Sequence, residues 1–226
     1  MLLELEKGAS GRTLLDIGCS FGWMLDEASR RGWQAVGVEP SASAAGEAKD
    51  AGLEVLEGHF PHPGLTGRRF DVVTLMDVFE HLPDPVRTLM EIRAVLDQRG
   101  LLAIKLPNSL GPIYRIASRL SQSSLGILTS PLARMYQLGS PYPHLFYYCE
   151  SNLCRLLEGN GFGIVRSYEE AVIERQGILD RLLYAARTDS DRLWLRFQAV
   201  GLSGLLVLVS AASHQDIFTV IARKRG

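Results

Sequence analysis

The sequence predicts an α/β fold, a doubly wound, seven-stranded and mostly parallel sheet with helical insertions. Short apolar, β-branched runs alternate with amphipathic helical patterns, which is typical of parallel sheets with helices on both faces. The run Phe70–Asp77 is almost continuously apolar, as a central strand buried on both faces requires. With 226 residues, 46% of them hydrophobic and 22% charged, the chain suits a single domain over 1–226.

The strands and helices follow one another with short links. The predicted strands are Thr13–Ile17, Gln34–Val38, Leu53–Leu56, Phe70–Asp77, Leu101–Leu106, Phe162–Tyr168 and Ile217–Arg223. The predicted helices are Trp23–Arg31, Ala42–Ala51, Val86–Leu96 and Asn152–Glu158. Their expected N-terminal caps are small polar residues that accept a backbone N–H, namely Ser41, Asp84 and Ser151. Pro85 strengthens the start after Asp84, because proline suits the first helical position.

Two stretches break the alternation and predict helical insertions, at about 109–148 and about 176–214. The first lies in a segment, Gln98–Cys149, that has no Asp or Glu and carries five cations, Arg99, Lys105, Arg115, Arg119 and Arg134. We expect this insert to be a lid over the active site that attracts an anionic or amphipathic substrate. The alternatives are a solvated basic insert and, less favoured, a helix resting on a membrane surface.

The second insertion contains an uncharged apolar run, Phe197–Ser213. A membrane-spanning helix needs about 20 predominantly apolar residues, and this run falls slightly short. We expect it to cover the sheet or to form a homodimer interface.

Composition excludes several classes of protein. The net charge of −1 gives no general argument for nucleic-acid binding. Three cysteines, Cys19, Cys149 and Cys154, lack C-x-x-C spacing and indicate neither a disulfide framework nor a zinc site, so a reducing cytoplasm fits best. The N-terminus has no basic segment typical of a signal peptide. The five histidines and the acids lack metal-ligand spacing, so no metal is expected.

The stretch Thr13–Ala28, TLLDIGCSFGWMLDEA, predicts a nucleoside pocket. A strand ending at Asp16 and Ile17 leads through a turn of small residues into a helix, whose N-terminus offers unpaired N–H groups. The next strand ends in Glu39, and an acid at this place can accept both hydroxyls of a ribose. The pocket would lie at the carboxyl edge of the sheet.

The spacing disfavours a dinucleotide. A pyrophosphate site needs G-x-G-x-x-G, but the frame that starts at Gly18 continues with Ser20 and Trp23. A nicotinamide-dependent oxidoreductase is therefore the weaker hypothesis.

The segment from Asp16 to Gly22, DIGCSFG, instead resembles the S-adenosylmethionine site of class I methyltransferases, with serine at 20 where glycine is commoner. FDVVTLMDVFEHLPDP, from Phe70, resembles the fourth-strand motif of the branch similar to ubiquinone-biosynthesis O-methyltransferases and bacterial small-molecule methyltransferases. HLFYYCESNLCRLLEGNGF, from His144, is similar to the same branch. The resemblance implies an antiparallel last strand, and the helix that usually precedes the first strand is expected to be cut down.

By position, the resemblance implies a cofactor site for S-adenosylmethionine and its product S-adenosylhomocysteine. Its residues would be Asp16, Gly18, Ser20, Gly22, Glu39, Pro40, Gly58, His59, Met76 and Asp77. The implied reaction is in-line methyl transfer to a small, lipophilic or anionic acceptor, on oxygen first. The candidates for a general base are His81 and His144. No N/D-P-P-[YF] tetrapeptide follows the fourth strand, which argues against a nucleic-acid acceptor. The alternative is a binding module that has lost turnover.

Overall fold

The computed structural model describes residues 1–111, 114–115, 143–170 and 215–226. Its helices are α1 (Leu2–Gly8), α2 (Trp23–Arg30), α3 (Ala42–Asp50), α4 (Pro85–Val95) and α7 (Glu150–Gly159), with 3-10 turns η1 (Pro63–Leu65) and η2 (Phe79–His81). Its strands are β1 (Thr13–Ile17), β2 (Gln34–Glu39), β3 (Glu54–Glu57), β4 (Phe70–Met76), β5 (Leu96–Pro107), β6 (Phe162–Glu170) and β7 (Ile217–Lys224).

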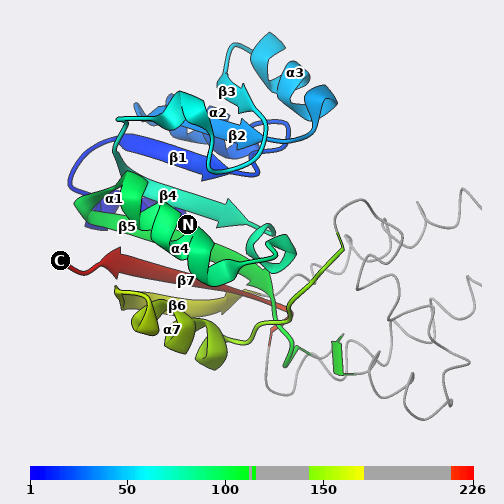
Figure 1. Cartoon of the computed structure of the whole chain (residues 1–226), viewed down its shortest axis with the longest axis vertical. Helices are drawn as coiled ribbons and strands as arrows, with labels where there is room; N and C mark the ends of the chain where they lie inside the picture. Colours follow the sequence, from blue (N-terminus) through cyan, green and yellow to red (C-terminus); the bar gives the residue numbers. More distant parts are fainter. Residues whose placement is uncertain (112–113, 116–142, 171–214) are drawn as a thin grey trace, which may run out of the picture.

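In the described residues the strands form one seven-stranded sheet in the order β3-β2-β1-β4-β5-β7-β6 (Figure 1). The pairs from β3 to β5 are parallel, and β7 runs antiparallel to both β5 and β6. This confirms the predicted doubly wound sheet with its antiparallel last strand. The chain order reverses between β1 and β4, and ligands of open α/β sheets bind at such a switch point.

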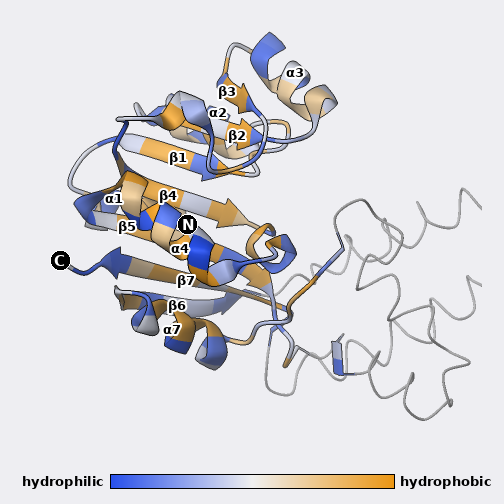
Figure 2. Cartoon of the chain, viewed as in Figure 1, coloured by the Kyte–Doolittle hydropathy of each residue, from blue (hydrophilic) through white to orange (hydrophobic). Residues whose placement is uncertain are grey.

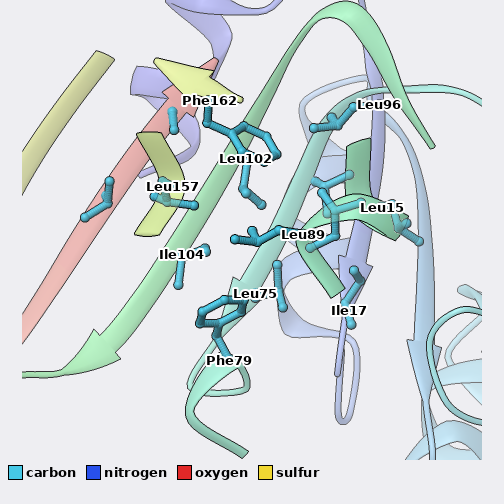
Figure 3. Packing of buried hydrophobic residues seen from close by; sticks show 14 of the residues in the cluster. Leu15, Ile17, Leu75, Phe79, Leu89, Leu96, Leu102, Ile104, Leu157 and Phe162 are labelled. Carbon is cyan, nitrogen blue, oxygen red and sulfur yellow. The ribbon is translucent and has the colours of Figure 1, made fainter. Parts of the chain in front are cut away.

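Helices cover both faces of the sheet, which gives the core two halves. One face carries α4 and α7, whose buried side chains pack on alternate residues of the central strands; Figure 3 shows Leu89 of α4 against Leu75 and Leu102. The other face carries α1, α2 and α3. The central strands are hydrophobic along most of their length (Figure 2), because both of their faces are buried.

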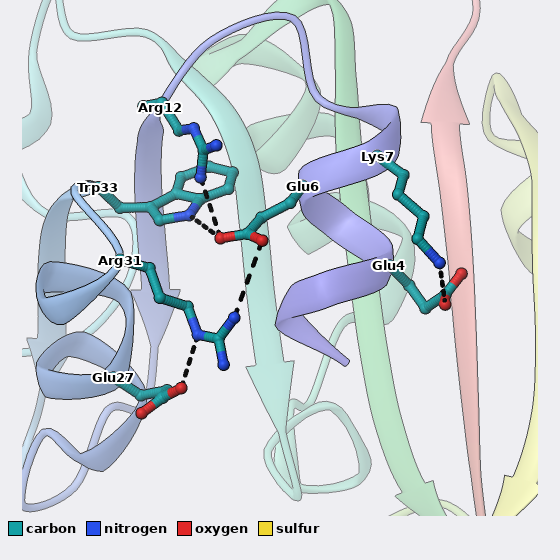
Figure 4. A network of polar contacts seen from close by, with 7 residues as sticks. All are labelled: Glu4, Glu6, Lys7, Arg12, Glu27, Arg31 and Trp33. Atoms are coloured by element: carbon teal, nitrogen blue, oxygen red, sulfur yellow. Dashed lines mark hydrogen bonds and ion pairs between the residues drawn. The ribbon is translucent and has the colours of Figure 1, made fainter.

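A short helix of seven residues, α1, precedes β1. Residues Leu2–Gly8 form α1, and its Leu5 is fully buried in the core on the α2 side. On the polar side, the Glu6 carboxylate receives Trp33 Nε1 at 3.3 Å and Arg12 Nη1 at 3.0 Å (Figure 4).

Two boundaries were predicted wrongly. β5 begins at Leu96 rather than at Leu101, because Leu96 pairs with Phe70 of β4 before the polar residues that suggested a loop. The helix before β6 is capped by Cys149, not by Ser151, since the Asn152 side chain accepts the Cys149 N–H at 2.9 Å. The predicted caps Ser41 and Asp84 are confirmed.

Most of the predicted insertions at 109–148 and 176–214 lie outside the described residues, as do Arg119, Arg134 and the run Phe197–Ser213. Within the described ranges, none of the helices has the length and apolar character needed to cross a membrane.

Two glycine substitutions test this packing. A Cβ at Gly37 of β2 would lie 2.3 Å from Cys19 Sγ and 2.8 Å from Leu25 Cδ1, so we expect Gly37→Ala to lower the free energy of unfolding by about 2 kcal/mol. A Cβ at Gly46, inside α3, meets nothing within 4 Å, so Gly46→Ala should raise it by about 0.5–1 kcal/mol. Urea denaturation of both variants measures the difference, and equal midpoints would contradict the packing described here.

Candidate active site

The turn after β1 is shaped by backbone conformations that only small residues adopt easily. Gly18 and Gly22 have φ of 74° and 81°, and a Cβ at Gly18 would lie 2.5 Å from Val78 Cγ2. Ser20 also has a positive φ, 49°, so serine takes the left-handed conformation that glycine would adopt without strain. The N–H of Gly18 donates to the carbonyl of Val38 at 2.7 Å, which fastens the turn to β2.

Glu39, the last residue of β2, holds the turn from the other side. Its Oε2 accepts the backbone N–H of Ser20 and its Oε1 accepts that of Ser41, both at 2.8 Å. The side chain is largely buried, with 8% of its residue surface exposed. Each oxygen keeps a second lone pair. The carboxylate therefore has a fixed orientation and can still accept the two hydroxyls of a ribose.

A cavity of about 660 Å³ opens beside this turn at the carboxyl edge of the sheet. Most of the predicted cofactor residues line it: Gly18, Ser20, Glu39, Pro40, Gly58, His59, Met76 and Asp77. The candidate base His81 lines it too. The sequence analysis missed the apolar part of the wall, formed by Ile17, Val38, Phe60, Val78, Leu82, Pro83, Pro143 and Leu145.

Three predicted site residues do not line this cavity. Asp16 lies just beneath the turn, where its Oδ1 accepts the Thr74 hydroxyl at 2.6 Å. A Cβ at Gly22 would meet Leu53 Cδ1 at 2.4 Å, so this glycine serves close packing. His144 lies behind His81, with the two ring centroids 4.7 Å apart. Asp16 and His144 thus lie outside the lining of the cavity, next to residues that line it.

Another part of the cavity wall is built by η2 and by residues 143–146, which the backbone carbonyl of Glu80 ties together. That carbonyl accepts the N–H groups of Leu145 at 2.9 Å and Phe146 at 3.1 Å. The Nδ1 of His81 lies 3.0 Å from the carbonyl oxygen of Pro143. A carbonyl only accepts, so we assign the proton to Nδ1, which leaves a lone pair on Nε2 of His81.

The side chain of Glu80 is the most unusual feature of this wall. It is only 2% exposed, and neither carboxyl oxygen has a hydrogen-bond partner among the described residues. Burial raises the pKa of Glu80 to about 8, and the nearby Asp77 adds to the rise. His144 Nε2 lies 3.9 Å from Glu80 Oε1, and burial together with His81 lowers the pKa of His144 to about 4. At neutral pH, Glu80 is mainly protonated and His144 is uncharged.

The three side chains can perform two kinds of chemistry. Glu80, His81 and His144 each offer a ligand atom, and these atoms lie within 4.8 Å of one another. One carboxylate and two imidazoles form a donor set that divalent transition metals accept, if Glu80 gives up its proton. Alternatively, a ring nitrogen can accept a proton from a bound acceptor. The expectation of no metal site rested on sequence spacing, which did not show that the fold brings His81 and His144 together.

The comparisons with known proteins agree with this geometry. A family model described as a methyltransferase domain matches residues 2–167, which is more than half of the chain. The chain belongs to this family of methyltransferase domains.

Among curated relatives of this methyltransferase-family chain is the ubiquinone biosynthesis O-methyltransferase of Aeromonas salmonicida, 29% identical over 167 residues, which are 71% of this chain and 66% of that protein. That of Bradyrhizobium sp. is 36% identical over 44% of this chain and 41% of that protein. The chain thus spans less than two thirds of the length of these relatives.

Solved structures share the fold. A SAM-dependent methyltransferase from Archaeoglobus fulgidus superposes with a TM-score of 0.60 at 18% identity, over 99% of this chain and 90% of that one. An S-adenosylmethionine-dependent methyltransferase from Mesorhizobium loti gives 0.59 at 15% identity, over 98% and 96%. These likenesses confirm the predicted α/β methyltransferase fold.

The role of Glu39 can be tested by a single-atom change. Glu39→Gln places an NH₂ group against the N–H of Ser20 or Ser41, so two donors face each other. We expect the Kd for S-adenosylhomocysteine to rise at least tenfold, as loss of a charge-assisted hydrogen bond of about 1.5–3 kcal/mol implies. Isothermal titration calorimetry measures it. Glu57→Gln, at the exposed end of β3, is the matched control, and an equal Kd in all three proteins would refute the role.

Proposed function

We propose that this chain transfers the methyl group of S-adenosylmethionine to a hydroxyl oxygen of a small, largely apolar acceptor. The observation that carries the proposal is one cavity with two chemically different walls. The turn and Glu39 line one part of it, and His81 with apolar side chains lines another part. A cofactor bound against the first wall would point its reactive end toward the second.

The first wall fits the cofactor. The main chain at Gly18 leaves no room for a Cβ, and the Glu39 carboxylate keeps acceptor capacity toward the cavity. Gly58 and His59, after β3, extend this wall on the side expected for the adenine. When bound, the cofactor supplies an already activated methyl group, so this chain has to align the acceptor and exclude water.

The second wall favours an acceptor with an apolar body. Phe60, Leu82, Pro83 and Leu145 contribute hydrophobic surface next to His81. The names of the relatives, ubiquinone biosynthesis O-methyltransferases, support oxygen as the methylated atom, since those proteins are named for O-methylation. The anionic character suggested by the basic segment depends on residues outside the described part of the chain, so we propose the apolar feature alone.

The acceptor hydroxyl would lose its proton at the cluster of Glu80, His81 and His144. The Nε2 lone pair of His81 can take the proton directly, because Nδ1 is already engaged by Pro143. A divalent cation held by the three side chains would instead lower the pKa of the hydroxyl. Both routes place the nucleophilic oxygen beside His81.

Replacing His81 tests this assignment. We expect His81→Gln to lower kcat for S-adenosylhomocysteine formation by about 100-fold, a typical contribution of a positioned acid or base, while the cofactor Kd changes less than about threefold. The assay would use a panel of phenols, catechols and aliphatic alcohols. His62→Asn is the control, because asparagine can retain the cap that His62 Nδ1 gives to Gly64.

Dialysis against EDTA separates the two routes. If turnover is lost, returns with added Mn²⁺ or Zn²⁺, and does not return in Glu80→Gln, the cation route operates; unchanged turnover supports His81 as the direct base. Cofactor binding without turnover on any acceptor would refute the proposed transfer and leave a binding module.

A further inference from the structure

A second buried carboxyl group, that of Asp16, lies beneath the turn after β1 and has no cationic partner among the described residues. Asp16 is 3% exposed, and no ion pair in the described part of the chain involves it. Its sheet neighbours are Gly37 on β2 and Thr74 on β4. The Thr74 hydroxyl donates to Asp16 Oδ1 at 2.6 Å. The next two residues of the chain, Ile17 and Gly18, already line the cavity.

The groups around Asp16 do not favour its ionised form, apart from this one hydroxyl. Cys19, from the turn, packs against Gly37 on the same face, and burial raises the pKa of its thiol to about 12, so it is uncharged. Glu39, at the end of β2, is a second carboxyl group nearby. Burial raises the pKa of Asp16 to about 7; the Thr74 hydrogen bond opposes the rise and Glu39 adds to it.

We propose that Asp16, held by Thr74, couples cofactor binding to proton release, so that S-adenosylmethionine binds the form of the protein in which Asp16 is ionised. The inference rests on the proposed function, because it takes S-adenosylmethionine as the ligand of the cavity. The cofactor carries a sulfonium and an ammonium group. A cation bound in the cavity beside Ile17 and Gly18 would lie next to the residues that follow Asp16 in the chain. It would stabilise the carboxylate, since the low local dielectric strengthens their attraction. The proton of Asp16 then passes to the solvent.

Linkage gives this coupling a consequence for turnover. If binding of the cation promotes ionisation, ionisation promotes binding by the same factor. The affinity for S-adenosylmethionine therefore rises as the pH increases through neutrality. S-adenosylhomocysteine lacks the sulfonium charge and gains less from an ionised Asp16. Asp16 would thus help the protein to exchange product for fresh cofactor.

Thr74 is the positioning residue in this scheme. Its hydroxyl stabilises the carboxylate, so Thr74→Val, which keeps the volume and removes the donor, should move the titration of Asp16 upward by about one pH unit or more. Thr219→Val is the matched control, because Thr219 is equally buried in the same sheet but lies on β7, two strands from β4.

The experiment is calorimetric titration of the full chain with S-adenosylmethionine between pH 6 and 8.5, in buffers of different ionisation enthalpy. The buffer dependence of the heat counts the protons released. We expect about half a proton at pH 7, because Asp16 is then about half protonated, and almost none at pH 8.5. S-adenosylhomocysteine should release fewer. Thr74→Val should move the release to higher pH, and Thr219→Val should match the unmodified protein.

Asp16→Asn provides the second readout. It should abolish the release, and the ligand-free variant should melt at a higher temperature than the unmodified protein at pH 8. The sign follows from the raised pKa: stability from a protonated Asp16 is present at low pH and lost as the pH rises through about 7, where the buried carboxyl ionises. Asparagine has no charge to lose.

The outcomes separate this inference from the proposed function. Binding of S-adenosylmethionine with no buffer dependence over the whole pH range, or with the same proton release in Asp16→Asn, overturns the coupling and leaves the proposed function standing. Absence of binding at every pH overturns both.

Discussion

The carboxylate of Glu39 holds the cofactor side of the site together. It accepts one N–H from the turn after β1, at Ser20, and one from the start of α3, at Ser41. The two donors belong to different segments, the turn after β1 and the start of α3, and Glu39 links these segments through hydrogen bonds. A charged acceptor forms stronger hydrogen bonds than a neutral one, and here it satisfies two main-chain donors at a nearly buried place. Together with the main-chain bonds of Gly18 and Cys19 to the Val38 carbonyl, this group fixes the shape of the turn and of the cavity wall next to it.

Three of the carboxyl groups near the cavity, those of Glu39, Asp16 and Glu80, have different environments, and this difference suits them to different roles. Each carboxylate oxygen of Glu39 accepts one backbone N–H. Asp16 has one hydroxyl donor, and its pKa is raised to about 7. The Glu80 carboxyl has no hydrogen-bond partner among the described residues, and burial raises its pKa further, to about 8. A carboxylate that hydrogen bonds hold in one orientation is suited to bind a ligand in one position. The pKa of a carboxyl group with few hydrogen bonds responds more strongly to a nearby cation.

The sequence predicts most residues on the Glu39 side of the cavity, because that side is local. Each of its turns follows a strand directly, and parallel strands bring their carboxyl ends to one edge, so Gly18 and Glu39 could be placed together from the pattern, and Met76 followed from the family resemblance. The antiparallel β7 was predicted from the family resemblance. Asp16 and Gly22 do not line the cavity, because strand alternation and the close approach of Leu53 are not visible in a motif.

The part of the wall formed by η2 and residues 143–146 comes from segments that are far apart in the sequence. The sequence therefore predicted it only in part. His81 and His144 were both chosen as candidates, but nothing in their spacing indicated that their rings would meet. What brings them together is main-chain bonding: the Glu80 carbonyl receives Leu145 and Phe146, and the Ser109 N–H donates to the Tyr148 carbonyl at 2.8 Å. Glu80 was not predicted as a site residue, because an acid before a helix is normally exposed to water. Its burial follows from this long-range closure.

The two walls also differ in what a change of sequence would do to them. The cofactor wall shares its residues with the central strands, so a substitution there disturbs the core, as the 2.3 Å approach of a Gly37 Cβ to Cys19 indicates. The part of the wall formed by η2 and residues 143–146 is attached to the sheet by a few main-chain bonds after β4 and β5. Phe60, Val78 and Leu82 pack against a core cluster, whereas Pro143 and Leu145 belong to neither cluster. Under the proposed function, acceptor preference can therefore change through Leu145 or Pro143 while the fold stays as it is. For this reason the fold determines the kind of reaction more closely than the molecule that is methylated.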